Sequence, residues 1–377
     1  MNCVFVFETL NLGGAERQGL LLARHLKVNG GAVSVLALTS SGPAIELCER
    51  YGLPWQVIGA DEGTGLRDWL SCLRLIRALR QIRPDLIMSY TTPPNVLCGR
   101  IWRWTGARAC IWNQRDEGRH LLSANRVQAR AIRRVSRVIS NSRHAADFLS
   151  QTFGLERSAI RVVQNGVELA PPQRSRDAWR QELGLRDGDL AVCMPANLHP
   201  HKDHRTLIQA WRQVVNAIDA SDKKAILVLA GAFVSTAEML QALATELGLK
   251  DRVRFLGQVR DMPGLLQAMD LGVFSSKHEG VPNGVLECMA AGLAVAATDI
   301  HGIREALGEA NQPWLSPPDN ADGLASRVLA LLNDPGLRQS VGAHNRQRAQ
   351  TEFSPERMTR DMVALMREVL GMEGLKN

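Results

Sequence analysis

The stretch 3-CVFVFETLNLGGAERQGLLLARHLKVNGGAVSVLAL-38 decides the fold class of this chain. Its first part, 3-CVFVFE-8, is an apolar run typical of a buried strand, and a Gly-Gly turn follows it. The segment 15–30 has apolar residues at helical spacing and ends on Gly30, as helices commonly do. The run 32-AVSVLAL-38 predicts a second strand. A strand, a helix and a strand in this order predict a β-α-β unit with parallel strands.

The same alternation continues along the chain and predicts two α/β domains. In the first half we expect helices at 66–82, 94–104 and 121–136, and strands at 85–90, 108–112 and 137–141. In the second half we expect strands at 189–197, 226–231, 252–257, 271–276 and 294–298, with helices between them. This pattern is typical of two Rossmann-like domains, each built on a doubly wound parallel sheet.

A Pro-rich polar stretch, 170-APPQRSRD-177, marks the expected linker in a chain whose 377 residues favour two domains. We expect a first domain at 1–168 and a second at 169–353. A final amphipathic helix within 354–377 opens with Ser-Pro-Glu, a helix-start signature. Two such domains facing each other across a crevice would hold ligands at the carboxyl ends of their strands.

The composition is that of an ordinary soluble enzyme, with 45% apolar and 22% charged residues. Glu8 interrupts the first apolar run and no basic segment precedes it, so a signal peptide is not expected. The longest apolar runs are too short to span a membrane. The seven scattered cysteines form no C-x-x-C pair and predict reduced thiols of a cytoplasmic protein.

The formal net charge of +7 is concentrated in the first half of the chain. Between Arg100 and Arg143 there are eleven arginines against two acids, Asp116 and Glu117. In the stretch 121–138, five arginines have a spacing that would place them on one side of a helix: Arg126, Arg130, Arg133, Arg134 and Arg137. This pattern favours a helix that lies on an anionic membrane surface, although a solvated arginine face over a core stripe fits it too. With two Tyr and no aromatic residues interleaved among the basic ones, nucleic acid is not an expected partner.

Two glutamates stand eight residues apart in 278-HEGVPNGVLECMAAG-292. The expected strand 271–276 leads to Glu279, which should therefore lie at the carboxyl edge of the second sheet. A helix ending at Gly292 follows a turn whose amides, with the helix dipole, can bind phosphate. The turn residues are Gly280, Val281, Pro282 and Asn283, and Pro282 suits the first position of the helix.

Glu287 lies inside this helix, where a carboxylate would repel phosphate but can accept two hydrogen bonds from a ribose diol. Glu279 stands on the other side of the phosphate seat, where a second set of hydroxyls can be held. The pattern predicts a binding site for a nucleotide diphosphate sugar. The alternative is that both acids only complement the helix dipole while 285–297 forms core.

The run 195-PANLHPHKDHRTLIQAW-211 offers a cation for the diphosphate, since Lys202 lies between an expected strand end and the next helix. Three histidines nearby, His199, His201 and His204, have no cysteine with them, so a solvated or structural role is favoured over zinc. Gly13 and Gly14 let the backbone approach a ligand, but without G-x-G-x-x-G they do not support a nicotinamide cofactor. The sequence 187-DGD-189 precedes a strand and is best interpreted as a turn.

These residues resemble a known family. Glu279, a seven-residue spacer and Glu287 are similar to the E-x7-E motif of retaining glycosyltransferase family 4. The 13-GGAE-16 turn, 164-QNGVE-168 and the NLHPHKDHRTLI run resemble other marks of that family, and the resemblance covers nearly the whole chain.

The resemblance implies a GT-B fold, with the acceptor on the N-terminal domain, the nucleotide sugar on the C-terminal one, and the last helix crossing back to the first. It implies metal-independent transfer of a sugar with retained configuration, with no cofactor. By position, the resemblance implies that Glu279 holds the donor sugar and stabilises the transition state. Glu287 would hold the ribose, and Lys202 the diphosphate. The other residues expected at the donor are Gly14, Asn197 and the turn 280–283.

Two positions depart from the family pattern. Many members have Gly-Arg where this chain has Ala196-Asn197, so another cation such as Arg205 would have to compensate. Many carry a histidine after the strand at 108–112, where Arg115 and Asp116 are the substitutes on the acceptor side.

The sequence thus predicts a retaining hexosyltransferase, cytoplasmic and peripheral at the inner face of the membrane. Its donor would be a nucleotide sugar, and UDP is the commonest nucleotide in the family. Its acceptor would be a glycan or a lipid-linked sugar in the assembly of a cell-surface polysaccharide. A nucleotide-sugar 2-epimerase and a non-catalytic sugar-nucleotide-binding protein remain alternatives.

Overall fold

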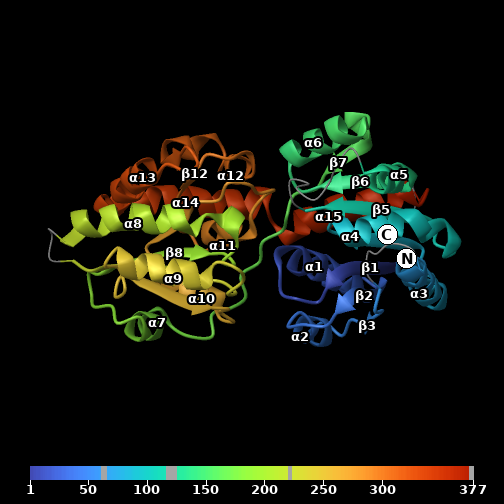
Figure 1. Cartoon of the computed structure of the whole chain (residues 1–377), viewed down its shortest axis with the longest axis horizontal. Helices are drawn as coiled ribbons and strands as arrows, with labels where there is room; N and C mark the ends of the chain where they lie inside the picture. Colours follow the sequence, from blue (N-terminus) through green and yellow to red (C-terminus); the bar gives the residue numbers. More distant parts are fainter. Residues whose placement is uncertain (61–65, 116–124, 220–222, 373–377) are drawn as a thin grey trace. The chain divides into compact units, whose positions relative to one another are not determined.

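The computed structural model describes residues 1–60, 66–115, 125–219 and 223–372, and it divides the chain into two compact units (Figure 1). Unit 1 consists of Met1–Gly166 and Pro355–Asn377, and unit 2 of Val167–Ser354. The segment that begins at Pro355 therefore belongs to the same unit as the N-terminus. The ligand roles expected for the two domains are not tested by this division and stay predictions.

Unit 1 is built on a seven-stranded sheet in the order β3-β2-β1-β4-β5-β6-β7, and every neighbouring pair is parallel. The predicted doubly wound parallel sheet is confirmed. Its strands are β1 (Asn2–Thr9), β2 (Ala32–Ser40), β3 (Trp55–Val57), β4 (Leu86–Tyr90), β5 (Ala109–Gln114), β6 (Arg137–Ser140) and β7 (Ile160–Val162).

Helices cover both faces of this sheet because successive residues of a strand point to opposite sides. Phe5 and Phe7 of β1 lie in one core cluster with α1, α2 and α15, whereas Val4 and Val6 lie in another with α3 and α4. The helices of unit 1 are α1 (Gly14–Val28), α2 (Ile45–Arg50), α3 (Leu66–Ile82), α4 (Thr92–Ile101), α5 (Arg126–Arg134), α6 (Arg143–Phe153) and α15 (Pro355–Val369).

The basic helix expected at 121–136 is shorter in the structure. Residues 121–124 lie outside the described part of the chain, α5 ends at Arg134, and Val135 is extended with ψ of 159°. Arg137 is the first residue of β6, pairs in register with Ile111, and forms an ion pair with Glu368 of α15. The prediction that Arg137 continues the arginine side of a helix is therefore wrong, because strand pairing and an acid on α15 fix it elsewhere.

Unit 2 has a six-stranded parallel sheet in the order β10-β9-β8-β11-β12-β13. Its strands are β8 (Leu190–Pro195), β9 (Ala225–Ala230), β10 (Val253–Gly257), β11 (Leu271–Phe274), β12 (Val295–Thr298) and β13 (Leu315–Ser316). Its helices are α7 (Arg176–Glu182), α8 (His204–Ile218), α9 (Ala237–Glu246), α10 (Met262–Ala268), α11 (Asn283–Ala290), α12 (His301–Leu307), α13 (Ala321–Asn333) and α14 (Pro335–Glu352).

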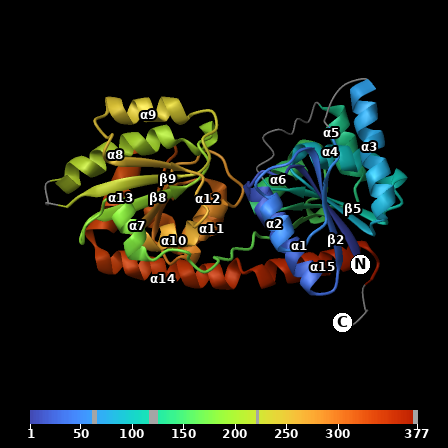
Figure 2. The same ribbon diagram turned by 90° about the horizontal axis from the view of Figure 1, so that it is seen from below.

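Each sheet has one point at which the strand order reverses. In unit 2 the chain runs from β8 outward through β9 and β10, then returns to β11 and runs the other way through β12 and β13. Figure 2 shows α8 and α9 on one face of this sheet and α10 and α11 on the other, as right-handed crossovers require. The switch point lies between β8 and β11, and in unit 1 it lies between β1 and β4. Ligands of such folds bind beyond the carboxyl ends of the strands at these points.

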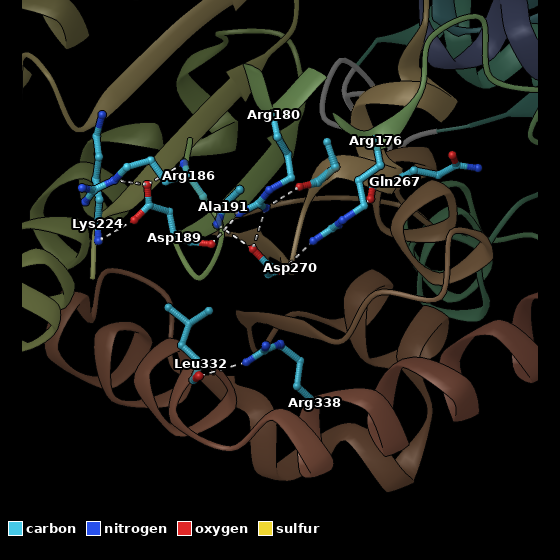
Figure 3. A network of polar contacts seen from close by, with 11 residues as sticks. Arg176, Arg180, Arg186, Asp189, Ala191, Lys224, Gln267, Asp270, Leu332 and Arg338 are labelled. Atoms are coloured by element: carbon cyan, nitrogen blue, oxygen red, sulfur yellow. Dashed lines mark hydrogen bonds and ion pairs between the residues drawn. The ribbon is translucent and has the colours of Figure 1, made fainter. Parts of the chain in front are cut away.

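The opposite, amino edge of the second sheet is held by a buried polar network (Figure 3). Arg180 of α7 donates to the main-chain oxygen of Asp189 at 2.7 Å and lies 3.4 Å from Asp270, which precedes β11. The Asp189 carboxylate accepts from the amides of Arg186 and Lys224. The 187–189 turn is thus part of this structural network, away from the carboxyl ends of the strands.

All seven cysteines belong to the described residues, and each is buried with its sulfur outside any disulfide. Burial raises the pKa of the Cys48 thiol to about 11. The interpretation of the cysteines as core thiols is confirmed.

Candidate donor-binding site

The first half of the site is the turn that follows β8. The chain leaves Pro195, forms a 3-10 turn over Pro200–Lys202, and enters α8 through Asp203. Asp203 has φ of 48°, a conformation that non-glycine residues rarely adopt, and its side chain caps the helix by accepting from Thr206. The cap fixes where α8 begins, and thereby places Lys202 at the carboxyl edge of the sheet.

The second half of the site is the loop that follows β11, the strand next to β8. This loop is bonded to the first turn at two places: Ser275 Oγ donates to the main-chain oxygen of Lys202 at 2.9 Å, and the Lys277 amide donates to that of His201 at 2.9 Å. Ser275 and Ser276 are both fully buried. The two loops on either side of the switch point therefore form one hydrogen-bonded unit.

Lys202 and Glu279 meet at this edge. The Lys202 ammonium forms an ion pair with Glu279 Oε1, and Ser276 Oγ donates to the same oxygen at 3.0 Å. The two side chains are 19% and 12% exposed, so water screens the pair only in part. A partly buried cation and carboxylate, both reachable from outside, can exchange their mutual contact for a phosphate and a hydroxyl group of a ligand.

Close backbone packing holds the Glu279 loop in place. Gly302, in α12, lies against the main-chain oxygens of Glu279 and Gly280 so closely that a Cβ atom there would overlap both. Thr298 Oγ1, at the end of β12, donates to the main-chain oxygen of Ser276 at 2.6 Å. Glycine is required at 302 because only it allows this approach.

Helix α11 follows the loop, as the sequence predicts, but begins one residue later than expected. Pro282 is the N-cap with extended ψ of 126°, and Asn283 is the first helical residue. Pro282 has no side-chain group that could cap the first amides. At the other end Gly292, with φ of 81°, donates to Met289 O, and Leu293 donates to Cys288 O, which is the Schellman arrangement. The helix therefore ends at the expected glycine.

Glu287 lies partly buried on α11, one turn beyond Asn283. Burial, and then the charge of Glu287, raises the pKa of the Cys193 thiol in β8. The Glu287 carboxylate is thus near the central strand of the sheet. Both glutamates of the motif therefore lie near the switch point, Glu279 in the loop before α11 and Glu287 on the helix itself.

Asn197 follows β8 and is already engaged. Its Oδ1 accepts from the amide of Ala232, just beyond β9, at 2.9 Å. Contact of Asn197 with a diphosphate would have to come from its amide nitrogen. Arg205, the suggested compensating cation, is exposed on the first turn of α8.

The three histidines near Lys202 do not converge on one point. The ring centroids of His199 and His201 are 4.4 Å apart. His204 is buried, and neither of its ring nitrogens has a hydrogen-bond partner among the described residues. Burial, and then the charge of Lys202, lowers the pKa of His204 to about 3, so it is neutral. Within the described residues no cluster of three or more His, Cys, Asp or Glu side chains is arranged to hold a metal ion.

In unit 1 the glycine turn leads directly into α1, with Gly13 as N-cap and Gly14 as the first helical residue. Burial raises the pKa of Glu16, in the first turn of this helix, to about 7. Gly14 is exposed. These residues lie at the switch point of the first sheet.

Arg115 follows β5 at the same edge of unit 1. Its Nη1 donates to Asn165 Oδ1 at 2.8 Å and its guanidinium lies over the Tyr90 ring. Its buried Nε and Nη2 have no hydrogen-bond partner among the residues that the structure describes. Burial lowers the pKa of Arg115. Asp116, the other acceptor-side candidate, lies outside the described residues.

Sequence reasoning missed the residues that position the pair. Ser275, Ser276 and Thr298 stand directly after or at the ends of β11 and β12, where small polar residues end an otherwise apolar strand. That change of polarity is a usable signal. The role of Gly302 leaves no such signal, because it depends on a contact between the start of α12 and the Glu279 loop, which are separated in sequence by β12.

Two family models match consecutive parts of the chain. Residues 12–171 match the model described as Glycosyltransferase Family 4, and residues 175–348 match the model described as Glycosyl transferases group 1. Each match lies mostly within one of the two compact units.

Curated relatives are distant. N-acetyl-alpha-D-glucosaminyl L-malate synthase of Bacillus anthracis is 26% identical over 198 residues, which are 52% of this chain and 50% of the relative. UDP-Gal:alpha-D-GlcNAc-diphosphoundecaprenol alpha-1,3-galactosyltransferase of Escherichia coli is 23% identical over 281 residues, 71% of this chain and 72% of the relative. The chain spans about half the length of several curated relatives that it matches.

A solved structure shares the architecture of the whole chain. The crystal structure of Anabaena Alr3699/HepE in complex with UDP-glucose has a TM-score of 0.84 at 22% identity, covering 98% of this chain and 100% of that one. This likeness shows the GT-B fold. The chain therefore has a GT-B fold, and its two halves are similar to the Glycosyltransferase Family 4 model and to the Glycosyl transferases group 1 model.

Proposed function

We propose that this protein is a retaining glycosyltransferase that moves a hexosyl unit from a UDP-sugar to a glycan or lipid-linked acceptor. The observation that carries the proposal is the Lys202–Glu279 ion pair at the switch point of the second sheet, beside the N-terminus of α11. A cation for the diphosphate, main-chain amides for its oxygens and a carboxylate for sugar hydroxyls stand there together.

In the proposed donor complex the diphosphate lies between Lys202 and the 280–283 turn. Glu287 accepts hydrogen bonds from the ribose hydroxyls, and Glu279 holds the sugar and stabilises the positive charge that develops on its ring. Ser276, which now donates to Glu279, keeps that carboxylate oriented. The bound UDP-glucose in the Anabaena structure supports a donor of this class.

The proposed reaction breaks the bond between the sugar C1 and the diphosphate oxygen while the acceptor oxygen bonds to C1 on the same face. The acceptor proton passes to the leaving phosphate, so the products are the glycosylated acceptor and UDP. The reaction therefore depends most on stabilising charge at the phosphate, for which Lys202 and the turn amides are placed.

Arg115 is the proposed acceptor-side residue of unit 1. A buried guanidinium whose Nε and Nη2 have no partner in the described part of the chain carries a desolvation cost that an anionic group would offset. A phosphate or carboxylate on the acceptor has this character. The Escherichia coli relative is named for a diphosphoundecaprenol substrate, which supports a lipid-linked acceptor and assembly of a surface polysaccharide at the membrane.

The test is release of nucleoside diphosphate by purified protein over a panel of UDP-, GDP- and ADP-sugars, with and without membrane lipid extract. We expect release from a UDP-sugar that rises with lipid extract. Conversion of the sugar without any acceptor would identify an epimerase instead. Binding of UDP without turnover of any donor would leave a binding protein and contradict the proposal.

A further inference from the structure

Helix α3 exposes a row of large apolar side chains. Leu66, Trp69, Leu70 and Leu73 follow at i, i+3, i+4 and i+7, and Leu66 and Trp69 are 70% and 57% exposed. We name these four residues the α3 apolar face. Figure 2 shows α3 as an outer helix of unit 1.

This face is not the one that packs on the sheet. The residues of α3 that are buried against the domain lie on its other side: Ser71, Cys72, Leu75, Ala78 and Leu79. Trp104, 56% exposed, adds to the apolar surface beyond the other end of the helix, where its main-chain oxygen accepts from Arg80 Nε at 2.9 Å. Single exposed apolar residues are common, but a row of four on one helix face marks an interaction surface.

Arginines surround the α3 apolar face. The second half of the helix lines an open hollow of about 810 Å³ in which Leu70 and Leu73 lie beside Arg74, Arg77, Arg80 and Arg83. The one acid of α3, Asp68, is neutralised by two hydrogen bonds from Arg100, at 2.8 and 2.6 Å. Among the described residues these four arginines form no ion pair, so the surface carries net positive charge.

We propose that α3 is the membrane-docking element of this protein, with the α3 apolar face inserted into an anionic bilayer and the arginines at its headgroups. Insertion would remove the exposed Leu and Trp side chains from water, and each arginine near the surface would add attraction to the anionic headgroups. A helix that exposes large apolar side chains next to arginines can bind at the surface of an anionic membrane. This inference rests on the proposed function, because a membrane-docking surface would serve an enzyme whose acceptor is linked to a lipid.

Charge complementarity favours lipid over a second copy of the chain. In a two-fold dimer built on α3 the arginines of one helix would face those of the other, with no acid of the helix left to compensate them. A bilayer containing anionic lipid supplies negative charge and an apolar layer at once. No helix of the described residues is long and apolar enough to cross a membrane, so docking would be at the surface.

Helix α5, the basic helix that the sequence points to, lacks the apolar part of such a surface. Its arginines at 130, 133 and 134 are exposed, but Ala131 and Ile132 are buried under the helix and Val127 is the large apolar residue that it exposes. Arginines without an apolar row can attract a membrane but have little to insert. We therefore infer that α3 anchors and that α5 adds attraction at most.

The experiment compares sedimentation with vesicles of phosphatidylcholine alone and of phosphatidylcholine with phosphatidylglycerol, without any donor or acceptor. The test variant is Trp69→Ser with Leu73→Ser. The matched control is Val28→Ser with Trp55→Ser, which removes two other exposed apolar side chains of unit 1. A second comparison variant reverses Arg130, Arg133 and Arg134 to Glu.

We expect the native protein and the Val28/Trp55 control to bind the anionic vesicles. The α3 variant should bind them at least about tenfold more weakly. Loss of binding in the α5 variant with full binding of the α3 variant would overturn the inference. So would a change of oligomeric state in the α3 variant, which would make the occupant a second copy.

Failure of this inference and failure of the proposed function are distinguishable. UDP binding, measured by calorimetry in the absence of lipid, should be equal in the native protein and the α3 variant. Vesicle binding without donor turnover would contradict the glycosyltransferase proposal alone, and donor turnover without vesicle binding would contradict the α3 proposal alone.

Discussion

Lys202 and Glu279 are 77 residues apart in the chain, yet their side chains form an ion pair at the carboxyl edge of the second sheet. The pair exists because β8 and β11 are neighbours, and because each strand is followed by a loop hydrogen-bonded to the other.

Replacing Glu279 by Gln should lower the turnover of the donor by about 10²- to 10³-fold, because the amide cannot balance positive charge on the sugar ring. Binding of UDP should stay close to that of the native protein, since Glu279 is proposed to contact the sugar. Steady-state kinetics and UDP calorimetry measure the two effects. Glu238→Gln, on the exposed start of α9, is the control, and normal turnover by Glu279→Gln would remove this residue from the mechanism.

Replacing Lys202 by Met should weaken the binding of UDP, unlike the change at Glu279. Loss of the cation removes a charge-assisted contact to the diphosphate, so the affinity for UDP should fall roughly tenfold. Turnover should fall as well. Lys250→Met, exposed in unit 2, controls for the loss of one positive charge. UDP affinity equal to that of the native protein would place the diphosphate elsewhere.

Replacing Gly302 by Ala should abolish most turnover while leaving the fold intact. The added Cβ would overlap the main-chain oxygens of Glu279 and Gly280, so the Glu279 loop must move. Gly336→Ala in α14 adds the same methyl group where there is space for it, and should be close to native in activity. Circular dichroism checks that both variants fold, and an active Gly302→Ala would show that the loop position is not critical.

The stability of the protein should depend on pH through His204. Burial and the Lys202 charge lower its pKa from 6.5 to about 3 in the folded state, so the unfolded chain binds more protons between these values. The contribution of His204 to the free energy of unfolding is fully present above about pH 6.5. It falls as the pH decreases toward 3, by at most about 1.4 kcal/mol per pH unit. Denaturant unfolding at pH 7 and pH 5 measures it.

The control for this effect is His204→Leu, which lacks the titrating ring. The difference in unfolding free energy between the native protein and this variant should shift in favour of the variant as pH is lowered. A constant difference across that range would mean that His204 becomes protonated in the folded protein as easily as in the unfolded chain.

The sequence by itself determined the α/β class, the two sheets and the glutamates of the motif. Apolar runs of strand length alternate with amphipathic segments, and this periodicity is a local property of the chain, as the match between the expected helix 66–82 and α3 shows. The end of α11 was predictable for the same reason, because Gly292 acts through its own backbone conformation.

Only the tertiary structure decided which of these residues meet. Strand order brings Lys202 to Glu279, moves Arg137 from a helix into β6 beside Glu368, and sets Gly302 against the Glu279 loop. It also decided which side of α3 is exposed, since both sides of that helix carry apolar residues. Such contacts join residues distant in sequence, and depend on how strands order and helices pack, which no local pattern specifies.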